Sequence, residues 1–224
     1  MSDDKYGPRN PLDVLNTRGL TAKREYVRGL EQRRDREALS LLVECLCDES
    51  WYLRELAEEA FLRLGDEHAS ALIPLLDQGL WFTRTSAARV LGRLGHRPAV
   101  PGLLRLAEDE NETVRRAAIE AMVMLAHQRG AVRVAHALHR LPAETRAGHL
   151  DAMRLRDRVV AEQLERLMKN DELMGLEHAD DVSDDDPAVR AAEEGVEWEL
   201  LTGPPPPGGR PAGESARPDG EPRA

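Results

Sequence analysis

Aromatic residues and cysteines are scarce in this chain, and long apolar runs are missing. Only 4% of the 224 residues are Phe, Trp or Tyr, so the core must consist mainly of Leu, Ala and Val, which favours closely packed helices. The only cysteines, Cys45 and Cys47, point about 200° apart on a helix, which disfavours a disulfide or a shared metal. Because neither a membrane-spanning run nor a signal-peptide pattern is present, we expect a cytoplasmic protein.

The net charge of −10 is concentrated near the C-terminus. Residues 171–200 contain twelve acidic residues and one basic residue, whereas residues 201–224 contain three of each. This leaves 27 of the 31 basic residues and 26 of the 41 acidic residues in residues 1–170. A nearly neutral body does not provide the basic groove typical of nucleic-acid-binding proteins, so nucleic-acid binding is a less favoured function.

An internal repeat runs through residues 21–170, marked by an arginine that recurs 30, 30, 31 and 31 residues apart. The five arginines are Arg24, Arg54, Arg84, Arg115 and Arg146. In most units, small or apolar residues follow the arginine at offsets of three and six, and the three middle units add a leucine at offset ten. These offsets define one face of a helix.

Each unit also contains a second apolar segment after a short break. These segments are Ala38–Leu46, Ala69–Leu76, Ala99–Leu106, Ala131–Leu138 and Val159–Leu167. In two units the break reads LGDEH or LGHRP, where glycine supplies the left-handed conformation that ends a helix. Since two short helices cannot bury both their faces alone, the hairpins must stack. We predict an all-α fold, an alpha solenoid of about five helical hairpins over residues 21–170, preceded by an N-terminal arm of residues 1–20.

The middle units resemble a known family of repeats. The stretches YLRELAEEAFLRLGDEHA, FTRTSAARVLGRLGHRPAVPGLLRLAEDE and TVRRAAIEAMVMLA are similar to the short HEAT-like repeats first described in phycobilin lyase subunits. The resemblance covers residues 21–170 and implies the same solenoid fold. It also implies an alternative function, an accessory or chaperone-like lyase subunit that acts on a cofactor-modified protein, although no residue here marks a pigment site.

The resemblance further implies a role for the repeated arginine. In HEAT repeats, an aspartate before the first helix pairs with this arginine and forms a structural ladder with charge-assisted hydrogen bonds. The expected pairs are Asp48 with Arg54, Asp77 with Arg84, and Asp109 with Arg115. The alternative is that the arginines form an exposed row that binds anions.

Four aromatic residues occupy equivalent places in two neighbouring units. Trp51 and Trp81 each lie three residues before a repeat arginine, and Tyr52 and Phe82 follow them directly. Stacked repeats place equivalent positions about 10 Å apart, which predicts an aromatic strip along one edge. These side chains either pack between repeats or anchor a partner. Because both members of such a pair cannot point inward from a helix start, we expect at least one per pair to be a binding anchor.

The sequence contains no catalytic motif, so we expect a protein that is not an enzyme and that uses no cofactor. It has no glycine-rich phosphate loop, nucleophile elbow or Cys-x-x-Cys motif. Four histidines gather in the last two units: His127, His136, His139 and His149. No placed carboxylate or cysteine completes a metal site with them, so we interpret them as packed or solvated and predict no metal site.

Residues 171–201 combine the acidic run with a short predicted helix that begins at Asp186 and Pro187. An apolar stripe follows on one face, made of Val189, Ala192, Val196 and Leu200. The segment is either a solvated acidic linker or a docking segment that caps the last repeats or binds another protein. The candidate docking residues are Arg146, Arg154, Arg156, Arg158 and Trp198. Residues 202–224 are rich in Pro and Gly, which predicts a disordered tail.

These observations favour a scaffold or adaptor that binds another protein rather than a membrane. We expect the recognition surface to combine the groove lined by the second helices with the aromatic edge near residues 51 and 82.

Overall fold

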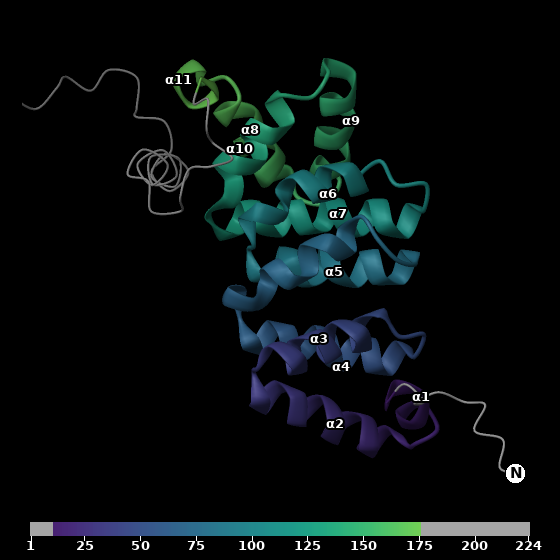
Figure 1. Ribbon diagram of the computed structural model, residues 1–224. Coiled ribbons are helices and arrows are strands. Elements are labelled where there is room, and N and C mark those ends of the chain that lie inside the picture. The colour runs from purple at the N-terminus through teal and green to yellow at the C-terminus, as the bar shows by residue number, and fades with distance from the viewer. Residues whose placement is uncertain (1–10, 176–224) are drawn as a thin grey trace, which may run out of the picture.

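The computed structural model describes residues 11–175, which are helical apart from short connections (Figure 1). The elements are α1 (Pro11–Asn16), α2 (Leu20–Arg33), α3 (Arg36–Cys47), α4 (Trp51–Leu64), η1 (Asp66–Leu76), α5 (Trp81–Leu94), η2 (Arg97–Ala99), α6 (Val100–Leu106), α7 (Glu112–Leu125), η3 (Ala126–Gly130), α8 (Ala131–His139), α9 (Ala143–Arg154), α10 (Arg158–Leu167) and α11 (Asp171–Met174). No strand occurs within this described part of the chain.

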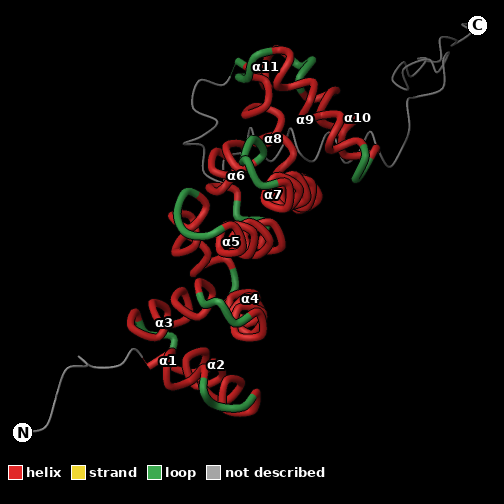
Figure 2. Tube along the Cα trace, turned by 90° about the vertical axis from the view of Figure 1, so that its right-hand side faces the viewer, coloured by secondary structure: helices red, strands yellow, loops and turns green. Residues whose placement is uncertain are grey.

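The helices form five hairpins, which we call repeats one to five. Their members are α2 with α3, α4 with η1, α5 with α6, α7 with α8, and α9 with α10. The first helices of successive hairpins pack on one another in one layer, and the second helices pack in another; Figure 2 shows α4, α5 and α7 end-on in a row. The predicted alpha solenoid is therefore confirmed.

Helix α1 lies within the segment that we expected to be an arm. Its leucines, Leu12 and Leu15, are buried in the common core. The side-chain amide of Asn16 donates a hydrogen bond to Asp48 Oδ2 over 2.8 Å. Helix α1 thus covers apolar surface at the open end of repeat one, as a terminal cap must.

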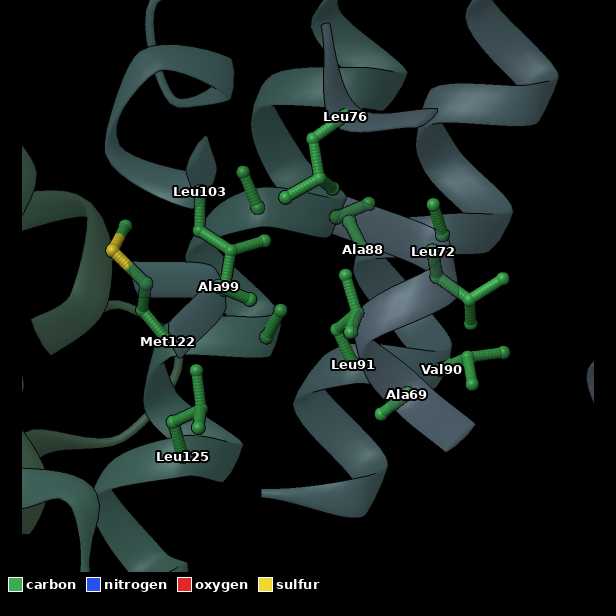
Figure 3. Packing of buried hydrophobic residues seen from close by; sticks show 14 of the residues in the cluster. Ala69, Leu72, Leu76, Ala88, Val90, Leu91, Ala99, Leu103, Met122 and Leu125 are labelled. Atoms are coloured by element: carbon green, nitrogen blue, oxygen red, sulfur yellow. The ribbon is translucent and has the colours of Figure 1, made fainter. Parts of the chain in front are cut away.

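The core follows the predicted helical face. Of the residues three positions after each arginine, Val27, Ala57, Ala87 and Ala118 are fully or almost fully buried. Around them pack leucines and a methionine from neighbouring helices, among them Leu91, Leu103, Met122 and Leu125 (Figure 3). Because the first helices meet through small residues, they approach closely.

The closest approach is between α5 and α7, at Gly92. A Cβ atom on Gly92 would lie 2.5 Å from Ala121 Cα and 2.6 Å from Ala121 Cβ. The positions eight residues after the arginine in repeats two and four are Leu62 and Val123, so glycine here is particular to repeat three. Repeats three and four are therefore packed backbone against backbone.

Residues with positive φ end the first helices of repeats one to four; Gly95 takes the predicted left-handed conformation, whereas Gly65 combines its positive φ with an extended ψ of −178°. Gly65 has φ 88° and Gly95 has φ 68°. In repeats one and four, Arg34 (φ 53°) and Arg129 (φ 67°) take this role. An arginine in this conformation carries a steric cost that glycine does not.

The second helix of repeat two is a 3₁₀ helix rather than the expected α-helix. Pro74 lies inside η1. Proline lacks an N–H group and its ring clashes with the carbonyl four residues earlier, so it interferes with α-helical hydrogen bonding. The longer rise per residue of a 3₁₀ helix still lets Ala69, Leu72 and Leu76 reach the core.

Both cysteines are free thiols on α3. Cys45 is buried, and this burial raises the pKa of its thiol to about 12, so it is protonated at neutral pH. Cys47 is half-buried, and burial also raises the pKa of its thiol.

Candidate partner-binding site

The repeated arginines hold the loops that precede the first helices. Arg54 Nη1 donates to the backbone carbonyls of Asp48 and Glu49 over 2.8 and 2.9 Å. Arg115 Nη1 makes the same two contacts, to Asp109 and Glu110, at the same distances. The arginine thus satisfies carbonyl groups where the chain turns into the next hairpin.

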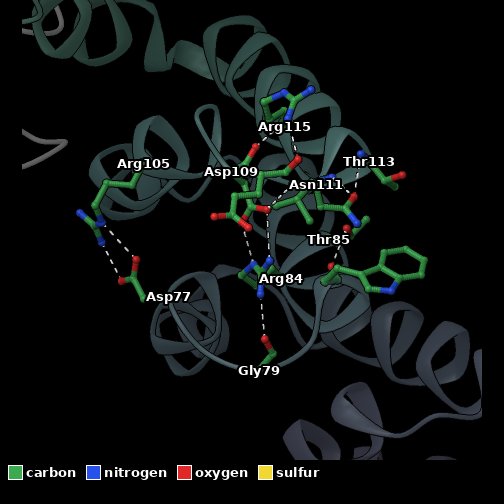
Figure 4. Close-up of polar contacts among 12 residues, drawn as sticks. Asp77, Gly79, Arg84, Thr85, Arg105, Asp109, Asn111, Thr113 and Arg115 are labelled. Carbon is green, nitrogen blue, oxygen red and sulfur yellow. Dashed lines mark hydrogen bonds and ion pairs between the residues drawn. The ribbon is translucent and has the colours of Figure 1, made fainter.

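The aspartates pair differently from the expected ladder (Figure 4). Asp109 accepts two hydrogen bonds from Arg84 of the preceding repeat, from Nε at 2.9 Å and from Nη2 at 3.1 Å. Asp77 forms a bidentate pair with Arg105 on α6, at 3.0 and 2.7 Å. The carboxylate of Asp48 accepts from the backbone N–H of Ser50 over 2.8 Å, rather than from Arg54.

Loop length explains why the contacts of Arg84 differ from those of Arg54 and Arg115. Asp48 and Asp109 lie six residues before their arginine, whereas Asp77 lies seven residues before Arg84. The longer loop contains Gly79 at φ 87°, whose carbonyl accepts from Arg84 Nη1 over 2.8 Å. The other two nitrogens of the Arg84 guanidinium, Nε and Nη2, bond to Asp109 and so connect repeat three to repeat four.

The Arg84–Asp109 pair is well shielded from solvent, with side-chain exposures of 22% and 13%. Burial alone would raise the pKa of Asp109, but the Asn111 N–H and the guanidinium of Arg84 outweigh it and hold the pKa below its ordinary value. The Asp77–Arg105 pair is exposed. There, the hydrogen bond from Arg105 lowers the pKa of Asp77, and burial opposes this weakly.

Replacing Asp77 with asparagine is expected to lower the free energy of unfolding at pH 6 by up to about 1 kcal/mol, the upper value for an exposed pair. Since the folded-state pKa of Asp77 lies below its ordinary value of 3.8, this stabilisation is complete above about pH 4 and is lost as pH falls through the folded-state pKa. Urea unfolding of wild type and Asp77→Asn at pH 6 and pH 3 checks this. A stability difference that stays constant or widens at pH 3 contradicts the assignment.

Each of the first two arginines also reaches an aromatic residue of the following repeat. Arg24 Nη2 donates to the Tyr52 hydroxyl over 2.8 Å, and Arg54 stacks over the Phe82 ring at 4.3 Å from its centroid. Both aromatic residues are half-buried. Tyr52 and Phe82 thus connect neighbouring repeats, and in repeat four, where Thr113 takes this position, Arg84 uses Asp109 instead.

The tryptophans point outward. Trp51 is 67% exposed and Trp81 is 47% exposed. Each ring meets its aromatic neighbour edge to face, with centroids 5.7 Å apart in both pairs. Since Tyr52 and Phe82 are fixed between repeats, they hold the tryptophan rings in position.

A groove of about 420 Å³ lies between α4 and α5 and is lined by both tryptophans. Arg54 and Arg89 contribute positive charge to the groove, and Glu55 and Glu58 contribute negative charge. Ser86 Oγ donates to Glu58 Oε1 over 2.5 Å and links the two helices. The groove combines exposed aromatic surface with charged groups of both signs.

Residues 69–154 match the family model described as HEAT repeats. No curated protein matches the chain. The matched segment covers repeats three and four, most of the second helix of repeat two and the first helix of repeat five, and so includes Trp81 but not Trp51.

The arginines expected to dock the acidic tail on the last repeats already have partners. Arg146 donates to the His139 carbonyl over 2.9 Å, Arg154 pairs with Asp151 and with Glu165, Arg156 lies 3.3 Å from Glu120, and Arg158 lies 2.6 Å from Glu162. Trp198 and the rest of the acidic segment after residue 175 lie outside the described residues. The structure therefore does not test the predicted docking at these arginines.

The histidines of repeats four and five are spread apart. His127 Nε2 lies 2.9 Å from Asp157 Oδ2, and His149 Nε2 lies 3.6 Å from Glu108 Oε1. Burial lowers the pKa of His149, and Glu108 opposes this in part. Within residues 11–175, no three His, Cys, Asp or Glu side chains gather closely enough to hold a metal ion. None of the helices described there is long and apolar enough to cross a bilayer.

Proposed function

We propose that the protein is an interaction scaffold whose groove between α4 and α5 binds a segment of a partner protein. The observation that carries this proposal is the pair of exposed tryptophans at equivalent positions on both sides of one groove. Repeat solenoids bind through extended surfaces of this kind. Tryptophan and arginine are also the residues that most often dominate the energy of protein interfaces.

The groove supports recognition of an extended or helical segment with a large apolar side chain. Such a side chain would lie between the Trp51 and Trp81 rings, while Arg54, Arg89 and Glu55 offer charged contacts at the sides. The rings cost little conformational entropy to order because their neighbours already hold them. The expected interface is small and suits a peptide rather than a whole domain.

Replacing Trp81 with alanine is expected to weaken partner binding about tenfold, because an interface anchor contributes more than about 1 kcal/mol. The melting temperature should hardly change, since the ring is half exposed in the unbound protein. The measurement is capture of partners from native lysate by full-length wild type and Trp81→Ala, followed by titration of the captured partner. Trp51→Ala should behave in the same way.

A matched control is Leu20→Ala, which removes another exposed apolar side chain, 59% accessible, from repeat one. It should retain every partner. If the tryptophan variants retain partners as well as Leu20→Ala does, the groove is not the binding site.

We further propose that the protein is not an enzyme and binds its partner without a cofactor. Absorbance and metal analysis of the purified full-length protein test this proposal. A pigment band would favour the accessory lyase function implied by the phycobilin-lyase-type repeats, and stoichiometric iron or zinc would favour catalysis. Binding to DNA or RNA that weakens steeply with salt would favour a nucleic-acid partner.

A further inference from the structure

A second groove lies on the opposite layer, between α6 and α8. Most residues of α8 are buried; Arg133 and Ala137 are partly accessible, and His139 and the C-cap residue Arg140 are exposed. The groove has a volume of about 310 Å³, and Leu104, Ala137 and Leu141 provide apolar lining. Arg105 and Arg140 line it as well.

The segments that contain α6 and α8 carry an excess of positive charge, although Asp77 of repeat two already pairs with Arg105 at the groove. Residues 121–143, which include α8, contain three arginines and no acidic residue. Residues 97–106, which include α6, contain Arg97 and Arg105 and again no acidic residue. Glu108 is the one carboxylate in the lining of the groove among the residues that the structure describes.

The chain leaves the repeats beside α8, one of the two helices that form this groove. Helix α11 follows α10 and packs against α8 (Figures 1 and 2). Met174, in its last turn, contacts the common core. The acidic segment therefore continues from residue 175 next to the positively charged helix.

We propose that the groove between α6 and α8 binds residues 186–200 of the same chain. This segment carries five acidic residues and one arginine, so its charge is opposite to that of the groove. Its apolar residues Val189, Val196 and Leu200 recur at helical spacing and match the apolar lining of the groove. With the apolar face buried, the acidic side chains would lie beside Arg140, while Arg105 keeps its pair with Asp77.

The connection is long enough for this docking. Residues 176–185 span up to about 35 Å when extended, whereas neighbouring packed helices lie about 8–10 Å apart. A tether of this length gives an effective concentration in the millimolar range, so a weak contact is enough to keep the segment docked. The docking covers the apolar lining that Leu104, Ala137 and Leu141 provide between repeats three and four.

Quenching of Trp198 fluorescence by acrylamide tests the proposal in the full chain. With Trp51→Phe and Trp81→Phe, Trp198 is the only remaining tryptophan. We expect a quenching constant about two- to threefold below that of free N-acetyltryptophanamide, because a docked ring is partly shielded. Arg140→Glu should weaken docking about tenfold by turning an attraction into a repulsion, and the quenching constant should then rise towards the free value.

Two further variants separate docking from misfolding. Val196→Ser with Leu200→Ser changes only the segment, leaves the repeats intact and should give the same rise in quenching. Arg28→Glu makes the same charge reversal at an exposed site in repeat one and should leave quenching unchanged.

Three outcomes overturn the proposal. The first is a Trp198 quenching constant, measured with the segment unaltered, that equals the constant of free N-acetyltryptophanamide. The second is protection of Trp198 that Arg140→Glu does not change. The third is protection that disappears on dilution together with a dimeric mass, because the groove then holds the segment of a second copy. None of these outcomes bears on the groove between α4 and α5, so the two proposals are tested separately.

Discussion

Gly92→Ala is expected to lower the free energy of unfolding by about 2–3 kcal/mol, although alanine normally stabilises a helix relative to glycine by about 1 kcal/mol. The new Cβ atom would lie 2.5 Å from the Cα atom of Ala121. Backbone atoms cannot move aside like a flexible side chain, so α5 and α7 must separate and lose contacts along their length. Urea unfolding measures the change.

Two other helical glycines provide the control. A Cβ atom on Gly29 in α2 or on Gly148 in α9 would meet nothing within 4 Å. Gly29→Ala and Gly148→Ala should therefore stabilise the protein by about 0.5–1 kcal/mol, the ordinary gain for this substitution. If all three variants change the free energy of unfolding in the same direction, the contact expected between a side chain at position 92 and Ala121 is contradicted.

Arg84→Ala is expected to lower the free energy of unfolding by about 1.5–3 kcal/mol, the usual contribution of hydrogen bonds to charged groups. The substitution removes both contacts to the shielded Asp109 carboxylate and the contact to the Gly79 carbonyl. It leaves Asp109 partly buried with only the Asn111 N–H as a donor. A double-mutant cycle with Asp109→Ala isolates the pair from the other effects.

The matched control is Arg105→Ala, since Arg105 and Asp77 form a pair of the same chemistry with exposures of 59% and 48%. An exposed pair contributes at most about 1 kcal/mol, so this variant should unfold almost like wild type. Equal losses for Arg84→Ala and Arg105→Ala would show that burial does not determine the strength of these pairs.

Much of the fold was predictable because the repeat provides five copies of one pattern. The predicted second segments end within about two residues of the observed helices, the usual uncertainty of helix boundaries. Several short elements escaped the pattern, and the proline in η1 did so as well. Helix α1 is only six residues long and lies before the first arginine, and Pro74 changes the type of η1 without changing its position.

The contacts of the site were less predictable, because they depend on where loops and neighbouring helices lie in space. One additional residue between Asp77 and Arg84 changes the partner of each. Arg105, the partner of Asp77, lies 28 residues away on a second helix, where no feature of the repeat marks it. The exposure of Trp51 and Trp81 likewise depends on Tyr52 and Phe82 filling the spaces between repeats.

The close packing of α5 against α7 sets the order in which the array assembles. In a linear array each repeat is coupled only to its neighbours, so folding begins at the strongest interface and unfolding begins at the ends. Repeats three and four share that interface, whereas α4 and α5 are separated by the groove beside the two tryptophans. A partner bound across this groove would add coupling between repeats two and three and would make their unfolding more cooperative.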